Sequence, residues 1–287
     1  MQEQTMDILE RIHASYYQLT ATERKVADFV LLHHEQVQFM SITQLADECG
    51  TADATISRFC RRLDLKGFNA FKLELARHAV TAGAPSVYVS PQEHDFATPE
   101  GRAREVGRLN QEAVSQTIEL ANNQAVQRAV ALFENAGKVL SMGAGGSMIM
   151  AEEFAHVFST VSGKFFSVAD SHLQMSAAAT MNPGDVVVLL SYSGATTNGL
   201  QILELAKSKG VSTVLVTRYP KSPAAKMADV VLLCGSNESP VQQGSVRAKV
   251  AQLVVMDLLY QEYCHRNRDT CEENLQSIAA ALTGMHL

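Results

Sequence analysis

The sequence predicts a two-part protein, in which an all-α head precedes an α/β domain built on a doubly wound, five-stranded parallel sheet. Three observations predict this fold class. Short helical patterns fill the first 80 residues, a stretch interrupted by Pro and Gly follows, and five Val- and Leu-rich runs then alternate with helix-length segments. With 287 residues, 46% of them hydrophobic, the chain is long enough to bury about two cores.

The composition disfavours several classes of protein. No run of about 18 uninterrupted apolar residues occurs, and the segment from Met1 to Glu10 is polar and acidic, unlike a signal peptide. We therefore expect a cytoplasmic protein without a membrane partner. The cysteines are five in number and lack CxxC spacing. We expect them to be reduced and mostly packed, with no structural metal site.

Two helical patterns in the head are separated by a tight turn. The spacing i, i+3, i+4, i+7 of an amphipathic helix occurs twice, in Ile42, Leu45, Ala46 and Cys49 and again in Ile56, Phe59, Cys60 and Leu63. Gly50 supplies the conformational freedom that the turn needs, and Thr51 or Asp53 is expected to cap the second helix. The pattern predicts a helix-turn-helix.

The second of these helices lies in the most basic part of the chain. Residues 54–80 carry six basic and two acidic side chains, whereas residues 1–53 carry three basic and nine acidic ones, so the net charge of −6 hides a local positive segment. An outward basic face can enter a major groove, where Arg reads guanine and hydroxyls reach bases or phosphates. The expected DNA-binding residues are Thr55, Ser57, Arg58, Arg61, Arg62 and Lys66. The alternative is a small helical bundle with a solvated basic face.

A connecting segment and a parallel sheet follow the head. We expect a linker from Thr81 to about Glu100 and a helix from near Gly101 towards Leu120. Strands are predicted at residues 138–142, 165–168, 185–191, 212–217 and 229–234, with helices such as 148–162, 172–181 and 197–209 between them. Continuous apolar strands that alternate with helices are typical of a buried parallel sheet with helices on both faces.

Two loops of small residues follow the first and third predicted strands. The first, GAGGS at 143–147, precedes a helix whose N-terminal N–H groups can surround an anion, and the second, SYSGATT at 191–197, is rich in hydroxyls. In a sheet of order 2-1-3-4-5 these two strands are neighbours whose carboxyl ends flank the ligand crevice. The loops are thus expected to bind a phosphate together. The alternatives are a turn that only caps a helix and a dinucleotide site, which Met148 at the third glycine position disfavours.

The head segments LTATERKVADFVLLH and SITQLADECGTADATISRFCRRLDLKGFNAFKLELA resemble the N-terminal domain of RpiR-type bacterial regulators, as do Lys66, Gly67 and Phe68 in particular. The resemblance implies that the second helix of the pair recognises DNA. Ala52 departs from the family's pattern, in which a Ser usually begins that helix. The base-contacting positions therefore stay open.

The motifs SxSGxT and GxGGS, together with VADSHLQMSAAATMNPGDVVVLLS and RAKVAQLVVMDLL, resemble the SIS (sugar isomerase) domain over residues 123–266. The resemblance implies that an effector, a phosphorylated sugar or sugar acid, contacts Ser147, Ser191, Ser193, Thr196, Glu238 and Ser245. It also implies a homodimer, with a tetramer as the alternative. The expected domains are a helix-turn-helix domain at 1–80, a linker and connecting helix at 81–122, the SIS domain at 123–266 and a C-terminal helix at 267–287.

These features predict a DNA-binding transcription regulator of sugar or sugar-acid metabolism that binds operator DNA and a phosphosugar, is not an enzyme and needs no cofactor. The alternative is a phosphosugar isomerase or lyase with a fused helical domain. That enzyme needs a positioned general base, for which Glu238 is the best candidate, while His156, His172 and His265 are expected to cap, pack or lie at the surface. A nucleotide-binding oxidoreductase is a third hypothesis, which Met148 and the head disfavour.

Overall fold

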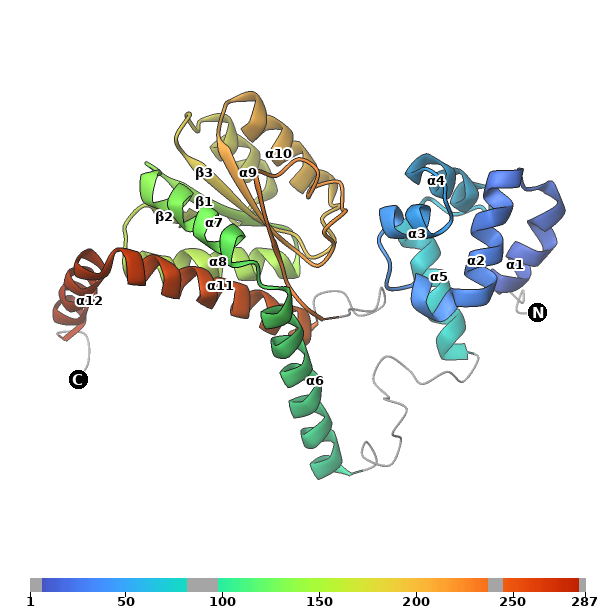
Figure 1. Cartoon of the computed structure of the whole chain (residues 1–287), viewed down its shortest axis with the longest axis horizontal. Coiled ribbons are helices and arrows are strands. Elements are labelled where there is room, and N and C mark those ends of the chain that lie inside the picture. Colours follow the sequence, from blue (N-terminus) through green and yellow to red (C-terminus); the bar gives the residue numbers. More distant parts are fainter. Residues whose placement is uncertain (1–6, 82–97, 237–244, 284–287) are drawn as a thin grey trace. The chain divides into compact units, whose positions relative to one another are not determined.

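The computed structural model describes residues 7–81, 98–236 and 245–283 (Figure 1). These residues fall into two compact units, one up to Arg108 and one from Leu109 onwards. The division lies inside helix α6 (Pro99–Leu120), within the segment 81–122 that the sequence assigns to the connection between domains.

Within residues 7–81 the head is a bundle of short helices around one core. Its elements are α1 (Ile8–Ser15), the 3-10 helix η1 (Tyr16–Gln18), α2 (Ala21–Val37), α3 (Ile42–Glu48), α4 (Asp53–Arg62) and α5 (Phe68–Thr81). Thr20 and Ser41 form capping boxes that begin α2 and α3. The fully buried rings of Phe59 and Phe71 meet edge to face with centroids 5.6 Å apart, which packs α4 against α5.

The C-terminal unit contains a five-stranded parallel sheet in the order β2-β1-β3-β4-β5, which confirms the predicted fold class and strand order. The strands are β1 (Val139–Gly143), β2 (Phe165–Ser167), β3 (Val186–Leu190), β4 (Ser212–Thr217) and β5 (Val230–Leu233). Val139 lies opposite Phe165 on one side and Val186 on the other. β1 and β3 are therefore neighbours in the middle of the sheet.

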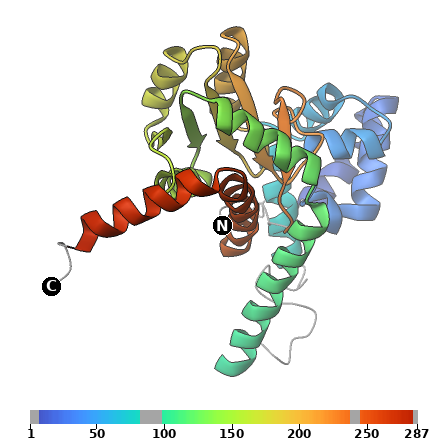
Figure 2. The ribbon, with the colours of Figure 1, turned by 60° about the vertical axis from the view of Figure 1, so that its left-hand side comes forward.

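Helices cover both faces of this sheet (Figure 1). They are α7 (Asn123–Asn135), α8 (Gly146–Ser159), α9 (Ser171–Ala179), α10 (Thr197–Ser208) and α11 (Val246–Arg266). Successive side chains of a strand enter opposite cores: Val186 and Val188 pack with α7, α8 and α11, whereas Val187 and Leu189 pack with α9 and α10. A last helix, α12 (Arg268–Leu282), extends away from the end of α11 (Figure 2).

The described helices include none that combines the length and the apolar character of a membrane span. All five cysteines are free, and the predicted packing is confirmed, since all but the half-buried Cys264 are buried. Burial raises the pKa of Cys49 to about 11 and that of Cys60 to about 12. Both side chains are therefore protonated thiols at neutral pH.

Candidate DNA-binding and ligand-binding sites

The turn between α3 and α4 has the predicted helix-turn-helix geometry. Gly50 takes a left-handed conformation with φ +60°, which a residue without a Cβ adopts at no steric cost. Its amide donates to the Asp47 carbonyl at 3.0 Å, and the Thr51 amide donates to the Ala46 carbonyl at 2.8 Å. These bonds end α3 and turn the chain directly into α4.

The predicted cap of α4 is wrong. The residue at the N-cap is Ala52, which has no capping side chain. Asp53 is one residue too far along, and its carboxylate accepts a hydrogen bond from the Thr43 hydroxyl of α3 at 3.0 Å instead. The Thr51 hydroxyl is buried and has no hydrogen-bond partner within the described part of the chain. Asp53 thus links α3 to α4 and does not cap α4.

Basic side chains lie at the surface on and just after α4. Arg58, Arg61 and Lys66 are exposed, and Ser57 is half-buried. Ile56, Phe59 and Cys60 of the same helix are fully buried, so α4 presents a polar face to solvent and an apolar face to the core. We call Ser57, Arg58, Arg61 and Lys66 the basic face of α4. Its residue types match those that contact guanine edges and phosphates in a major groove.

The predicted outward orientation of Thr55 is wrong. This side chain is only 5% exposed. Thr55 precedes the buried Phe59 by four residues, and residues at this separation lie on the same side of a helix. Its hydroxyl accepts a hydrogen bond from the Arg58 guanidinium at 3.3 Å. Thr55 is therefore a buried residue that orients the Arg58 guanidinium, and it is not part of the basic face of α4.

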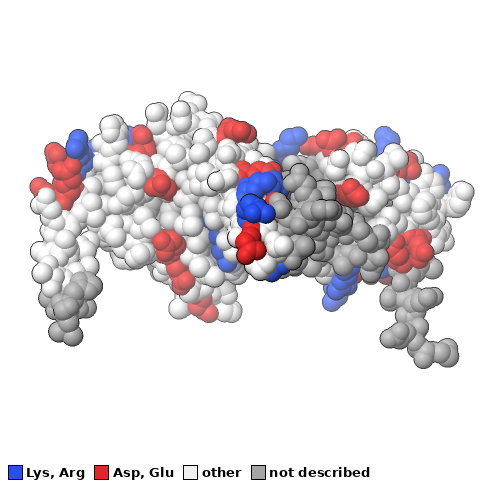
Figure 3. Space-filling view, turned by 90° about the horizontal axis from the view of Figure 1, so that it is seen from below, with Lys and Arg blue, Asp and Glu red and all other residues white. Residues whose placement is uncertain are grey.

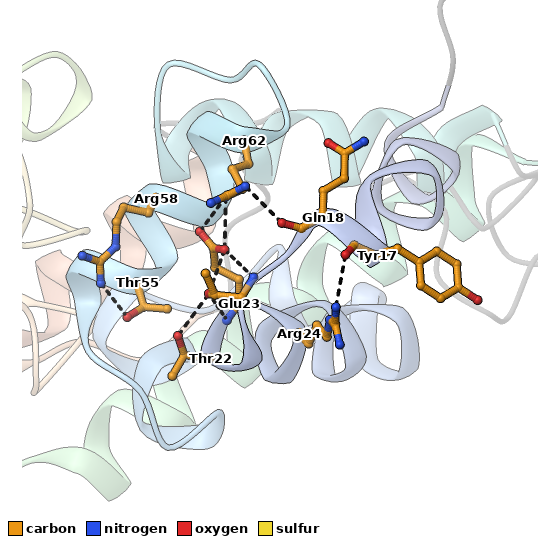
Figure 4. Close-up of polar contacts among 9 residues, drawn as sticks. Tyr17, Gln18, Thr22, Glu23, Arg24, Thr55, Arg58 and Arg62 are labelled. Atoms are coloured by element: carbon orange, nitrogen blue, oxygen red, sulfur yellow. Dashed lines mark hydrogen bonds and ion pairs between the residues drawn. The ribbon is translucent and has the colours of Figure 1, made fainter.

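Arg62 holds α4 against the beginning of α2 (Figure 4). Its guanidinium lies 3.1 Å from the carboxylate of Glu23 and also donates to the Gln18 carbonyl at 3.1 Å. Glu23 is buried, and its carboxylate accepts hydrogen bonds from the amide and hydroxyl of Thr20 as part of the α2 capping box. Arg62 thus ties α4 to α2, while its side chain stays 47% exposed. The sequence missed this role because Glu23 and Arg62 lie on different helices.

The environment of Glu23 favours its charged form. Burial alone would raise the pKa of this carboxyl, but the hydrogen bonds from Thr20 and the charge of Arg62 outweigh it, so the pKa is lowered from 4.5. Because the unfolded chain binds the proton more readily, the ionised carboxylate stabilises the folded head above about pH 4.5. This contribution is lost as the pH falls through the lower pKa of the folded state.

We expect Glu23→Gln to lower the free energy of opening the junction between α2 and α4 by about 1 kcal/mol at neutral pH, because a neutral amide bonds Arg62 less strongly. The effect is no larger because solvent screens the half-exposed guanidinium. Hydrogen exchange of peptides that cover α2 and α4, measured at pH 7 and pH 4, checks this. Wild type should lose protection towards pH 4 relative to the variant. The exposed Glu35 provides the matched control Glu35→Gln, and equal behaviour of both variants would contradict the role of Glu23.

The two loops after β1 and β3 begin at the same level of the sheet. Gly143, the last residue of β1, is paired with Leu190, the last residue of β3. A Cβ at Gly143 would lie 2.6 Å from the Ser147 carbonyl oxygen and 3.0 Å from that of Leu190. Only glycine allows the first turn of α8 and the end of β3 to approach this closely. The structure therefore brings the two predicted loops together at the carboxyl edge of the sheet.

The hydroxyl-bearing residues of the loop after β3 differ in their exposure to solvent. Ser191 is buried and accepts from the Gly194 amide at 3.2 Å, whereas Ser193 is half-buried and accepts from the Ala195 amide at 3.3 Å. Thr196 is the N-cap residue of α10, yet its side chain makes no capping hydrogen bond and lies 3.5 Å from the Ser191 hydroxyl. A loop that only caps a helix would use this hydroxyl for the cap.

Gln174 joins the two loops, and the sequence analysis missed it. This α9 side chain is 1% exposed, and its amide nitrogen donates to the Gly143 and Val168 carbonyls, each at 2.9 Å. Its amide oxygen accepts from Asn198 in the first turn of α10 at 3.1 Å. One buried amide thus links the ends of β1 and β2 to the helix that follows the hydroxyl loop. Such a bridge leaves no periodic signal in the sequence.

The remaining predicted ligand contacts are Ser147, Ser245 and Glu238. Ser147 is half-buried in the first turn of α8. Ser245 is buried, and its hydroxyl caps α11 by accepting from the Ala248 amide at 3.2 Å. Glu238 lies outside the described residues. His156, His172 and His265, which were expected to cap, pack or lie at the surface, are all exposed. No His, Cys, Asp and Glu side chains of the described residues are grouped so as to hold a metal ion.

Comparison with known proteins identifies both domains. The model of the helix-turn-helix domain of the rpiR family matches residues 6–81, and that of the SIS domain matches residues 132–261. An uncharacterized HTH-type transcriptional regulator of Caldanaerobacter subterraneus is 31% identical over 254 residues, which cover 88% of this chain and 89% of that protein. The HTH-type transcriptional regulator HexR of Escherichia coli is 28% identical over 278 residues, covering 96% of this chain and 94% of HexR.

A solved structure shares the fold along nearly the whole chain. The Vibrio vulnificus NanR protein, complexed with ManNAc-6P, superposes with a TM-score of 0.87 at 22% identity and covers 98% of this chain and 100% of that chain. The helix-turn-helix in the head, the parallel sheet that follows it and the regulator relatives all agree. The chain therefore belongs to the RpiR family of DNA-binding transcriptional regulators, in which a helix-turn-helix head precedes a SIS domain.

Proposed function

We propose that this regulator acts in sugar or sugar-acid metabolism and that a phosphosugar bound at the loops 143–147 and 191–197 changes its affinity for operator DNA. The pairing of Gly143 with Leu190 carries the proposal, because it places both loops at one edge of the sheet. The hydroxyls of Ser193 and Thr196 and the N-termini of α8 and α10 all lie at this edge. N–H groups at helix N-termini favour a phosphate.

Further support comes from the absence of a capping bond at Thr196 and from the burial of Ser191. The Thr196 hydroxyl is available to a ligand, and the Ser191 hydroxyl shapes the loop by accepting from the Gly194 amide. The complex of NanR with ManNAc-6P supports a phosphosugar as the class of ligand. We propose that Ser147, Ser193 and Thr196 contact this ligand directly and that Ser191 and Gln174 position the loops.

We also propose that the regulator binds DNA as a homodimer, with a tetramer of two dimers as the alternative. The basic face of α4 is a single short surface, and one recognition helix offers few base contacts. A two-fold symmetric pair presents two such helices to a palindromic operator. The segment 81–122 then connects each head to its SIS domain. The ligand acts by binding more tightly to one of two states of the dimer.

A thermal-shift screen of phosphorylated sugars and sugar acids against the full-length protein tests this function. A ligand present at about a hundred times its dissociation constant adds roughly 2.7 kcal/mol of stability to the folded protein. We expect one phosphosugar to raise the melting temperature, its unphosphorylated form to leave it unchanged, and the same compound to shift operator affinity. A compound that stabilises the protein and is isomerised or cleaved by it would favour the phosphosugar isomerase or lyase instead, with Glu238 as the candidate base.

A further inference from the structure

One face of α11 is apolar and lacks a covering element within the described residues. Val246 is 67% exposed and Leu253 is 39% exposed, although both belong to a helix whose other side is buried against the sheet. Lys249, Val250 and Asp257 lie on the same face, since they are three or four residues from Leu253. We call these five residues the α11 stripe. Uncharged surface of the C-terminal unit lies between scattered acidic and basic side chains (Figure 3).

The α11 stripe borders a groove of about 320 Å³ beside α8. The groove is lined by Val157, Val250, Leu253, Val254, Met256 and Asp257. Apart from one carboxylate, this lining is apolar. An apolar groove that continues an exposed apolar helix face is typical of a surface that a protein partner covers.

The charges on the α11 stripe complement each other in only one simple arrangement. Lys249 lies four residues before Leu253, and Asp257 lies four residues after it. When two copies of α11 pair antiparallel about Leu253, Lys249 of each copy meets Asp257 of the other. No carboxylate among the described residues forms an ion pair with Lys249, and Asp257 accepts only from Gln261 one turn later at 3.1 Å.

The same arrangement matches apolar residues with each other. Leu253 meets its own copy at the centre. Val250 lies opposite Met256, which lines the groove but is only 3% exposed. Farther out, Val246 lies opposite the half-buried Tyr260 ring. A helix of 21 residues is about 30 Å long, so the whole row fits along one continuous contact.

We propose that the α11 stripe is the surface through which two copies of this chain pair, with the two α11 helices antiparallel and Leu253 near the two-fold axis. This inference rests on the homodimer of the proposed function and assigns it a surface. The self-complementary order of Lys249, Leu253 and Asp257 identifies the occupant of the groove as a second copy, because a two-fold interface requires each patch to complement itself.

Sedimentation equilibrium of full-length variants tests the surface. Leu253→Asp should weaken dimerisation about a hundredfold or more, since it places two unpaired carboxylates against each other in an apolar contact. Lys249→Asp and Asp257→Lys should each weaken it about tenfold through like-charge contacts. The double variant Lys249→Asp, Asp257→Lys should restore the wild-type constant, because it exchanges the charges and keeps each contact complementary.

Leu173→Asp is the matched control, because Leu173 is 59% exposed on α9, which covers the opposite face of the sheet. It should leave the dimer intact. If Leu253→Asp stays dimeric, or if the charge exchange does not restore pairing, the α11 stripe is not the dimer surface, although the homodimer itself stands. A monomeric wild type would contradict both the surface and the homodimer. If Leu253→Asp fails to fold by far-UV circular dichroism, the charge variants decide, since their positions are partly or fully exposed.

Discussion

The double variant Arg58→Ala, Arg61→Ala is expected to weaken operator binding by at least about thirtyfold, because each arginine that reads a base contributes about 1 to 3 kcal/mol. Both side chains are exposed on the basic face of α4, and a hydrogen bond to the Thr55 hydroxyl orients the Arg58 guanidinium. Fluorescence anisotropy measures the effect, with an operator selected from random DNA by the wild-type protein. Repeating the titration at several salt concentrations distinguishes phosphate contacts from base contacts. Each lost phosphate contact lowers the magnitude of the slope of the logarithm of the binding constant against the logarithm of the salt concentration by about 0.9.

Arg77→Ala is the matched control for this experiment. Arg77 is exposed on α5 and forms an ion pair with Glu74 at 2.6 Å, so its loss removes positive charge from the head without touching the basic face of α4. The control should retain operator affinity within a few-fold. Unchanged operator affinity in the Arg58, Arg61 double variant would contradict α4 as the recognition helix. An equal loss on operator and on random DNA would identify both arginines as phosphate contacts.

Replacing Ser193 by Ala is expected to lower effector affinity roughly ten- to a hundredfold, because a hydrogen bond to a charged phosphate contributes about 1.5 to 3 kcal/mol. Ser193 suits this test better than Ser191, since the buried Ser191 hydroxyl bonds the Gly194 amide and its removal would also disturb the loop. Operator titrations across a range of concentrations of the phosphosugar from the thermal-shift screen give the response midpoint. Operator binding without effector should be that of wild type, because the two sites lie on different domains.

Ser208→Ala provides the control for this variant. Ser208 is exposed at the C-terminal end of α10, where its hydroxyl donates to the Leu205 carbonyl at 2.7 Å, and α10 begins directly after the hydroxyl loop. It should leave the response midpoint unchanged. A wild-type midpoint in Ser193→Ala would show that the phosphate sits elsewhere. Loss of operator binding in the absence of effector would assign Ser193 a structural role instead.

The sequence by itself determined the fold class, because the signals for it are local and periodic. Apolar residues at helical spacing defined α3 and α4, and the Val- and Leu-rich runs defined strands that end within one or two residues of those observed. The alternation of strands and helices predicted a parallel sheet, and the order 2-1-3-4-5 expected for it, in which the loops after β1 and β3 meet, is the observed one. Each of these inferences uses backbone geometry that repeats along the chain.

Only the tertiary structure decided which side chains of the sites are available to a partner. Arg62 and Arg58 look alike in the sequence, but Glu23, 39 residues away, ties Arg62 to α2. Thr55 sits at the edge of a buried helix face, and Gln174 bridges the ends of two strands to α10. These contacts join residues that are distant along the chain. Periodicity along one element carries no information about them, because the packing of different elements sets their distances.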